Sequence, residues 1–160
     1  MYKRQLYCSG EPNSVYQAEV VKECLEAKGL KVEIYTFADS NDVSTVTASA
    51  CADSDVIYIP TDNTAANCAK AISAVALPAG VPIIAGEEGI CAGCGVATLS
   101  IDYYELGRTT GQMAVKILKG EANVSDMAIE YYPEPAKKYN ADIASQLNVT
   151  IPEGYAAIEG

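Results

Sequence analysis

The stretch from Asp55 to Thr64, DVIYIPTDNT, constrains the fold of this chain more than any other. Its β-branched and aromatic run is typical of a strand that is buried on both faces of a parallel sheet. Pro60 has no backbone N–H to donate, so we expect the strand to end there. The four polar residues after Pro60 suit a helix start, because their side-chain oxygens accept unpaired N–H groups. Ligands of open α/β sheets bind beyond the carboxyl ends of strands, so this cluster is either a helix cap or one wall of a site.

Short strand patterns alternate with helix patterns along the chain, at steps of about 20–30 residues. The predicted strands are Leu6–Cys8, Lys31–Thr36, Asp55–Ile59, Pro82–Ala85, Gly95–Ile101 and Met127–Tyr132. The predicted helices are Val15–Lys28, one from Asp42 to about Ala50, an Ala-rich one ending near Val75, Asp102–Lys119 and Ala136–Leu147. This order predicts an α/β fold, a doubly wound parallel sheet with right-handed crossovers. We expect the first strand to lie between the second and third, as in flavodoxin-like and Rossmann-like sheets.

Composition excludes several function classes. The 160 residues suffice for one domain with a core, and the formal net charge of −10 argues against binding nucleic acid or an anionic membrane surface. The chain has no His, which excludes imidazole catalysis and His-ligated metals. We expect no catalytic residue, no metal site and no cofactor.

Six cysteines are present, and only Cys91 and Cys94 have the spacing of a redox or metal motif. A structural zinc site would need a second ligand pair, which the sequence does not offer. We therefore interpret this stretch as a loop of small residues and predict that the cysteines are structural, with Cys8 and Cys68 as buried thiols.

The first five residues, MYKRQ, show no pattern, and Leu6 to Cys8 resembles the end of a strand whose start is missing. The codons GTG-TAT-AAG-AGA-CAG would encode MYKRQ, and they resemble the mosaic end of a transposon used for sequencing libraries. We expect residues 1–5 to be an assembly scar fused to a truncated gene, to be left out of fold reasoning.

Polar loops follow four predicted strands, at Ser9–Ser14, Ala38–Asp42, Thr61–Thr64 and Gly86–Gly89. Three of them combine an acid with small hydroxyl or amide residues. Capping alone does not explain this recurrence, because the Glu87-Glu88 pair precedes no strong helix pattern. The loops therefore favour a ligand-binding face at the carboxyl edge of the sheet.

Four motifs resemble a known family: LYCSGEPNSVYQ, DVIYIPTDNTAA, VPIIAGEEG and IDYYELGRTTGQMAVKILKGE, in this order and spacing. Together they look like ABC-transporter substrate-binding proteins of the tryptophan/tyrosine-binding type. The resemblance implies the type I periplasmic binding protein fold, in which two doubly wound lobes close on a small ligand. It covers nearly everything from Leu6 to about Glu153, whereas the family's full chain is about twice as long. The Cys91–Cys94 loop departs from the family pattern.

The resemblance implies the second lobe alone. Residues 6–101 would form the ligand-binding lobe, residues 102–132 would cross to a first lobe that is missing, and residues 133–160 would return. It further implies an amino-acid ligand, with aromatic amino acids favoured, and ABC permease subunits as partners. The full protein would be extracytoplasmic, as a lipoprotein or in the periplasm.

The ligand-binding residues that we predict on this basis are Ser9, Glu11, Asn13, Ser14, Thr61, Asp62, Asn63, Thr64, Glu87 and Asp102. Ser9, Asn13 and Ser14 precede a helix start that favours a carboxylate. Asp62 and Glu87 can pair with an ammonium group, and Asn63 suits either end of the ligand. Two acids have simpler interpretations: Glu11 as a solvated surface residue, and Asp102 as a helix N-cap. Tyr103 and Tyr104 are interpreted as core or lobe packing residues, although an aromatic ligand could stack on either.

Two other functions remain open at this point. One is a thiol-based enzyme or redox protein that uses Cys91 and Cys94, but no base lies near either nucleophile in the sequence. The other is a receiver-like signalling module with Asp62 as phosphoryl acceptor. A receiver module would need an acidic pair at the end of the first strand and a lysine after a later strand, and this sequence has neither.

Overall fold

The computed structural model describes residues 2–131 and 134–158, which form a seven-stranded sheet in the order β2-β1-β3-β4-β5-β6-β7. The strands are β1 (Tyr2–Cys8), β2 (Lys31–Phe37), β3 (Val56–Ile59), β4 (Ile83–Ala85), β5 (Ala97–Ser100), β6 (Ala136–Tyr139) and β7 (Ala156–Ala157). Strands β1 to β5 are parallel, β6 is antiparallel to β5, and β7 is parallel to β6. The predicted α/β fold and the position of the first strand between the second and third are confirmed.

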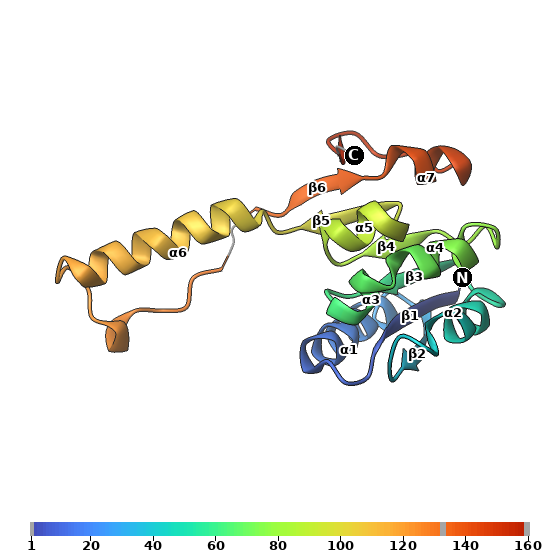
Figure 1. The fold of residues 1–160 in the computed structure, drawn as a ribbon, viewed down its shortest axis with the longest axis horizontal. Coiled ribbons are helices and arrows are strands. Elements are labelled where there is room, and N and C mark those ends of the chain that lie inside the picture. Colours follow the sequence, from blue (N-terminus) through green and yellow to red (C-terminus); the bar gives the residue numbers. More distant parts are fainter. Residues whose placement is uncertain (1, 132–133, 159–160) are drawn as a thin grey trace.

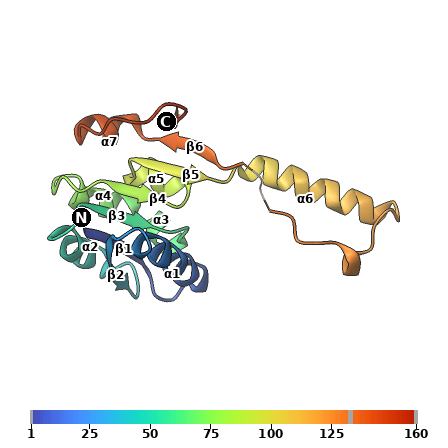
Figure 2. The ribbon, with the colours of Figure 1, turned by 180° about the vertical axis from the view of Figure 1, so that it is seen from behind.

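The helices form two unequal layers on the sheet. They are α1 (Pro12–Glu26), α2 (Val43–Cys51), α3 (Asn63–Asn67), α4 (Ala69–Ala76), α5 (Glu88–Cys94), α6 (Tyr103–Leu118) and α7 (Ala141–Gln146), with a 3-10 turn η1 at Val124–Asp126. Helices α2 to α5 pack side by side over one face, whereas α1 covers the opposite face only over β1 and β2 (Figures 1 and 2).

The hydrophobic core lies between the sheet and the layer of α2 to α5. Alternate strand residues such as Leu6, Ile57 and Ile83 point into this layer and are fully buried, as the period of two in a strand requires. Helix residues such as Ile72 and Ile90 pack onto these strand residues from the helix layer. The strand residues between them point to the other face.

Helix α6 projects from the body as an arm, together with the segment 119–131 that returns beside it (Figures 1 and 2). None of its residues is buried. Its residues Met113 and Ile117 line a hollow with Val124, Met127 and Ile129 of the returning segment. Within the described residues, no helix combines the length and apolar character needed to cross a membrane.

Two predicted elements near the C-terminus are wrong. The segment Ala136–Leu147 is not one helix: residues 136–139 form β6 along the edge of β5, and Asn140 caps the short α7 by accepting a hydrogen bond from the Ile143 N–H at 3.1 Å. Residues 127–131 of the predicted strand Met127–Tyr132 are not in a strand, and residue 132 lies outside the described part. An isolated segment on an arm has no neighbouring strand to pair with, so its β pattern is not realised.

The N-terminal residues take part in the fold, contrary to our expectation that they could be left out. Strand β1 begins at Tyr2 and pairs with β2 along its whole length. Arg4 is buried and forms an ion pair with Glu33 at 3.0 Å, and Gln5 is fully buried between β2 and β3. The origin of residues 1–5 as a scar stays a prediction.

Candidate functional site

Five of the described helices begin at the carboxyl edge of the parallel strands, and an acidic residue stands at the start of each. The connections β1–α1, β2–α2, β3–α3, β4–α5 and β5–α6 place Glu11, Asp42, Asp62, Glu87 and Asp102 at the respective N-cap positions. Carboxylates are stabilised there by unpaired N–H groups and by the helix dipole. The predicted polar edge therefore exists, and most of its acids are engaged in capping.

Asp62 is the buried centre of this edge, with 1% of its surface exposed. Its Oδ1 accepts a hydrogen bond from the Ala65 N–H at 2.7 Å, and its Oδ2 accepts one from the Cys8 N–H at 2.8 Å. Asp62 thus caps α3 and ties the end of β1 to the end of β3. Both oxygens have a backbone partner, so its main role in this geometry is structural.

The simpler interpretation of Glu11 as a solvated surface residue does not hold. Its carboxylate accepts four hydrogen bonds, from the backbone N–H and side chain of Asn63 at 2.9 and 3.1 Å and from those of Thr64 at 2.8 Å each. Burial raises the pKa of Glu11, but these four bonds outweigh it and the net shift of the pKa is downward. Glu11 thereby serves as a second anion at the start of α3.

The predicted carboxylate-binding group Ser9, Asn13 and Ser14 is bound internally instead. Helix α1 starts at Pro12, so Asn13 and Ser14 lie in its first turn and not in a loop before it. The Asn13 Nδ2 and the Ser14 Oγ donate to the Thr61 carbonyl at 2.8 and 3.2 Å. Ser9 donates to the Phe37 carbonyl at 3.3 Å.

Glu87 stands directly before a helix that begins at Glu88, which corrects our sequence interpretation. Glu87 caps α5 by accepting hydrogen bonds from the N–H groups of Gly89, at 2.7 Å, and Ile90. The pattern was missed because α5 has only seven residues, several of them Gly or Ala, and shows no clear apolar stripe.

A close backbone contact holds the β3 and β4 loops together. A Cβ atom built on Gly86 would lie 2.6 Å from the Thr61 nitrogen and 2.7 Å from the Pro60 carbonyl carbon. Only glycine therefore fits at position 86 without moving the loop. The Thr61 Oγ1 also donates to the Gly86 carbonyl at 3.3 Å, so Thr61 and Gly86 fix the two loops beside each other.

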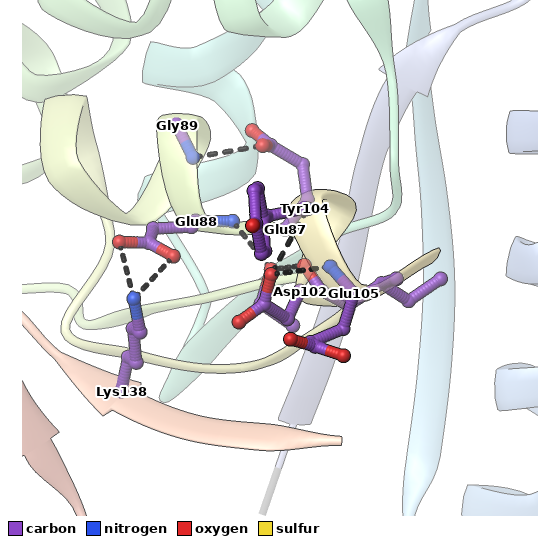
Figure 3. Close-up of polar contacts among 9 residues, drawn as sticks. Glu87, Glu88, Gly89, Asp102, Tyr104, Glu105 and Lys138 are labelled. Atoms are coloured by element: carbon purple, nitrogen blue, oxygen red, sulfur yellow. Dashed lines mark hydrogen bonds and ion pairs between the residues drawn. The ribbon is translucent and has the colours of Figure 1, made fainter. Parts of the chain in front are cut away.

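Asp102 is the N-cap of α6, as its simpler interpretation predicted, with Oδ1 accepting from the Tyr104 and Glu105 N–H groups at 3.0 and 3.1 Å. Figure 3 shows this cap beside a second interaction, in which Lys138 of β6 points at the Glu88 carboxylate at 2.7 Å. The ion pair joins β6 to the start of α5.

A cavity of about 170 Å³ opens among these helix starts. Its lining residues are Thr61, Asp62, Asn63, Ala66, Glu87, Gly89 and Tyr103. Four of the ten predicted residues line it, namely Thr61, Asp62, Asn63 and Glu87. The other six do not, namely Ser9, Glu11, Asn13, Ser14, Thr64 and Asp102, although Glu11 accepts hydrogen bonds from Asn63.

Sequence reasoning missed Ala66 and Gly89 as lining residues, and it named Tyr103 only as a second alternative to packing. Tyr103 and Tyr104 were interpreted as packing residues, yet 58% and 78% of their surfaces are exposed. Tyr103 follows the Asp102 cap directly, and this position at the end of β5 was the available signal. Tyr103 thus lines the cavity with a side chain that remains largely exposed.

The two cysteines with redox spacing are poor candidates for a reactive site. Cys91 and Cys94 lie inside α5, not in a loop, and burial raises the pKa of each to about 12. A thiol that stays protonated at neutral pH is a poor nucleophile. Cys8 is buried as predicted, whereas Cys68, at the break between α3 and α4, is half-buried.

Comparison with known proteins agrees with this architecture. The family of ABC transporter substrate-binding proteins matches residues 4–158. A tyrosine-binding protein from Clostridioides difficile is 29% identical over 144 residues, which are 90% of this chain and 41% of the relative.

Solved structures of this kind are similar over nearly the whole chain. An ABC domain from Streptococcus pneumoniae in complex with L-Trp is 30% identical with a TM-score of 0.85, over 98% of this chain and 55% of that one. A ligand-free, open substrate-binding protein with adhesive properties from Clostridium difficile is 33% identical with a TM-score of 0.81, over 99% and 54%. The chain thus spans about half the length of the solved relatives, and it belongs to the family of ABC transporter substrate-binding proteins.

Proposed function

We propose that this chain is one lobe of the solute-binding component of an ABC importer and forms one wall of a cleft for an amino acid, with aromatic amino acids favoured. The observation that carries the proposal is the cavity at the carboxyl edge of the sheet, where ligands of doubly wound folds bind. The L-Trp complex and the tyrosine-binding relative support the ligand class.

The lining of the cavity suits the ammonium group and the ring of such a ligand. Asp62 and Glu87 contribute carboxylates, and no Lys or Arg is among the described residues that line the cavity. An ammonium group is therefore favoured at this wall over a carboxylate. Tyr103 offers a face on which an aromatic ring can stack. In this arrangement, the donors for the ligand's carboxylate come from outside this lobe.

The size of the cavity argues that this wall is incomplete. Ligand sites are usually about 300–1,000 Å³ and bury most of the ligand, whereas this cavity has about 170 Å³. In the proposal, residues 102–132 cross to a first lobe, residues 133–160 return, and the two lobes close on the ligand. The isolated chain then binds weakly.

The full protein, on this proposal, delivers its ligand to ABC permease subunits outside the cytoplasm, as a lipoprotein or in the periplasm. Substrate-binding proteins of this family are generally not enzymes, and the buried thiols agree with a role in binding alone.

Calorimetric titration with L-tryptophan and L-tyrosine tests the proposal on a matched pair of variants. Tyr103→Ala removes the exposed ring that lines the cavity, and Tyr104→Ala removes an exposed ring that does not line it. We expect the first change to weaken binding several-fold and the second to leave it unchanged. Equal effects of the two changes, or absence of binding by the unchanged chain at millimolar ligand, would contradict the assignment.

A further inference from the structure

The carboxylate of Glu11 holds one residue of the cavity wall from outside the cavity. Its Oε2 accepts hydrogen bonds from the Asn63 backbone N–H at 2.9 Å and from the Asn63 Nδ2 at 3.1 Å. Asn63 lines the cavity, whereas Glu11 does not. The contact joins the start of α1 to the start of α3 across 52 positions of sequence. A hydrogen bond between a ligand in the cavity and this pair therefore goes to Asn63.

The chemistry of the pair fixes the orientation of the Asn63 amide. An ionised carboxylate has acceptors and no donor, so Asn63 must turn its NH₂ group toward Glu11. The Thr64 N–H and Oγ1 donate to the other carboxylate oxygen, Oε1, at 2.8 Å each, which keeps the Glu11 carboxylate from rotating. The amide oxygen of Asn63, Oδ1, is the end of the amide that Glu11 does not use.

This amide oxygen is an available acceptor in a wall whose acids are already engaged. Both oxygens of Asp62 and both oxygens of Glu87 accept hydrogen bonds from backbone N–H groups. Among the described residues, none donates to the Asn63 Oδ1, whose amide is engaged through its nitrogen. A ligand donor at Oδ1 therefore gains a hydrogen bond without breaking an existing one.

The start of α3 offers no backbone donor that could attract a carboxylate instead. The N–H groups of Asn63 and Thr64 donate to Glu11, and the Ala65 N–H donates to Asp62. The first three N–H groups of this helix are thus occupied by side chains of the same chain. What the helix start presents to the cavity is the Asn63 acceptor, which favours an ammonium group over a carboxylate.

We propose that Glu11 is a positioning residue for the ligand, because it holds the Asn63 amide so that Oδ1 accepts a hydrogen bond from the ligand's ammonium group. The inference rests on the proposed function and assigns recognition of the ammonium group to one pair of residues. Both the charge and the length of Glu11 then matter. Glu11→Gln introduces an N–H group that can occupy the Asn63 Oδ1, whereas Glu11→Asp keeps the charge but shortens the side chain by one methylene.

Titration of the chain with tryptamine, followed by NMR, tests this role. Tryptamine has the ring and the ammonium group of tryptophan but no carboxylate. Asp42→Asn is the matched control, because it also removes one negative charge from a helix start at this edge of the sheet, and Asp42 neither caps α2 through its side chain nor lines the cavity. We expect both Glu11 variants to weaken tryptamine binding about three- to tenfold, the equivalent of one hydrogen bond, and Asp42→Asn to leave it unchanged.

The side-chain NH₂ signals of Asn63 give a second readout, which a purely structural role of Glu11 would not predict. These signals are identified by their loss in Asn63→Ala. They should move when tryptamine is added to the unchanged chain, and in both Glu11 variants they should be displaced before any ligand is added. Circular dichroism confirms that each variant is folded under the conditions of the titration.

The outcomes separate this role from the proposed function. If the unchanged chain binds L-tryptophan but neither Glu11 variant loses affinity for tryptamine, the positioning role is overturned and the proposed function stands. Loss of affinity in Glu11→Gln but not in Glu11→Asp would overturn the role as well, because charge alone would explain it. If the unchanged chain binds neither ligand at about 10 mM, well above the dissociation constant of a weak site, both the role and the proposed function are overturned.

Discussion

The buried carboxylate of Asp62 accepts a hydrogen bond from the Cys8 backbone N–H at 2.8 Å, across 54 positions of sequence. This bond joins the end of β1 to the cap of α3, where Asp62 also accepts from the Ala65 N–H. Substitution Asp62→Ala leaves both N–H groups without an acceptor and should lower the free energy of unfolding by about 2–4 kcal/mol. Urea denaturation measures this loss.

The control for Asp62 is Asp39, whose carboxylate accepts one exposed hydrogen bond from the Asn41 N–H. We expect Asp39→Ala to change the free energy of unfolding by less than about 1 kcal/mol. Equal losses in the free energy of unfolding for the two substitutions would show that the buried Asp62–Cys8 hydrogen bond stabilises the fold no more than an exposed one.

Gln5 is fully buried in β1, and neither of its amide atoms has a hydrogen-bond partner among the described residues. An unsatisfied buried amide costs about 1–3 kcal/mol. The near-isosteric change Gln5→Met should therefore raise the free energy of unfolding by about that amount.

Gln17 provides the opposite case, because its side-chain oxygen accepts a hydrogen bond from the Thr61 N–H at 3.1 Å. Gln17→Met should lower the free energy of unfolding. Urea denaturation measures the free energy of unfolding of both variants. A loss of stability in Gln5→Met would mean that the Gln5 amide has hydrogen-bond partners in solution.

Glu11 makes stability depend on acid pH. Its folded-state pKa lies below the ordinary value of 4.5, so its contribution is present above that value and is lost as the pH falls through the folded pKa. We expect Glu11→Gln to lower the free energy of unfolding at pH 7 by about 0.5–1.5 kcal/mol. The difference from the unchanged chain should shrink on acidification, measured by thermal unfolding between about pH 5 and pH 3. A difference that stays constant over this range would contradict the role of the ionised carboxylate.

The cysteines should react in the order of their exposure. Cys24 is exposed, whereas Cys91 and Cys94 are buried and have pKa values raised to about 12. With a chromogenic disulfide reagent at pH 8, we expect Cys24 to react first and the α5 pair only after unfolding. Cys24→Ser should remove the fast phase. Rapid reaction of Cys91 or Cys94 in the folded chain would reopen a thiol-based function.

The parallel part of the fold could be predicted from sequence because its signals are local. Val56 to Ile59 form a β-branched and aromatic run that ends at a proline, and Gly29 stops α1 with a positive φ of 76°. The errors arose where neighbours decide the structure. Residues 136–139 became a strand because the edge of β5 was available for pairing, which no local pattern of Ala136 to Tyr139 reveals.

The polar edge of the sheet could be predicted from the sequence, but the residues that line the cavity could be predicted only in part. Polar side chains do gather at the carboxyl edge. The sequence does not show which of the carboxylates accept hydrogen bonds from backbone N–H groups of the same chain. The contact between Glu11 and Thr64 joins residues 53 positions apart and turns a predicted ligand-binding acid into part of the scaffold. Tyr103 was assigned mainly to packing for the opposite reason, because an apolar pattern on α6 suggests burial that the arm does not provide.

An NMR titration of the ¹⁵N-labelled chain with L-tryptophan tests directly whether this lobe binds an amino acid, with indole as the control that lacks the amino-acid head. We expect weak, saturable amide shifts confined to residues 61–66, 87–89 and 103, the segments around the cavity, with much smaller shifts for indole. The dissociation constant of a weak site is about 1 mM, so about 10 mM L-tryptophan should nearly saturate it. The claim that this lobe is a wall of an amino-acid cleft would be contradicted by absence of shifts at that concentration. Shifts centred on Val56 and Ile84, on the opposite face of the sheet, would contradict it as well.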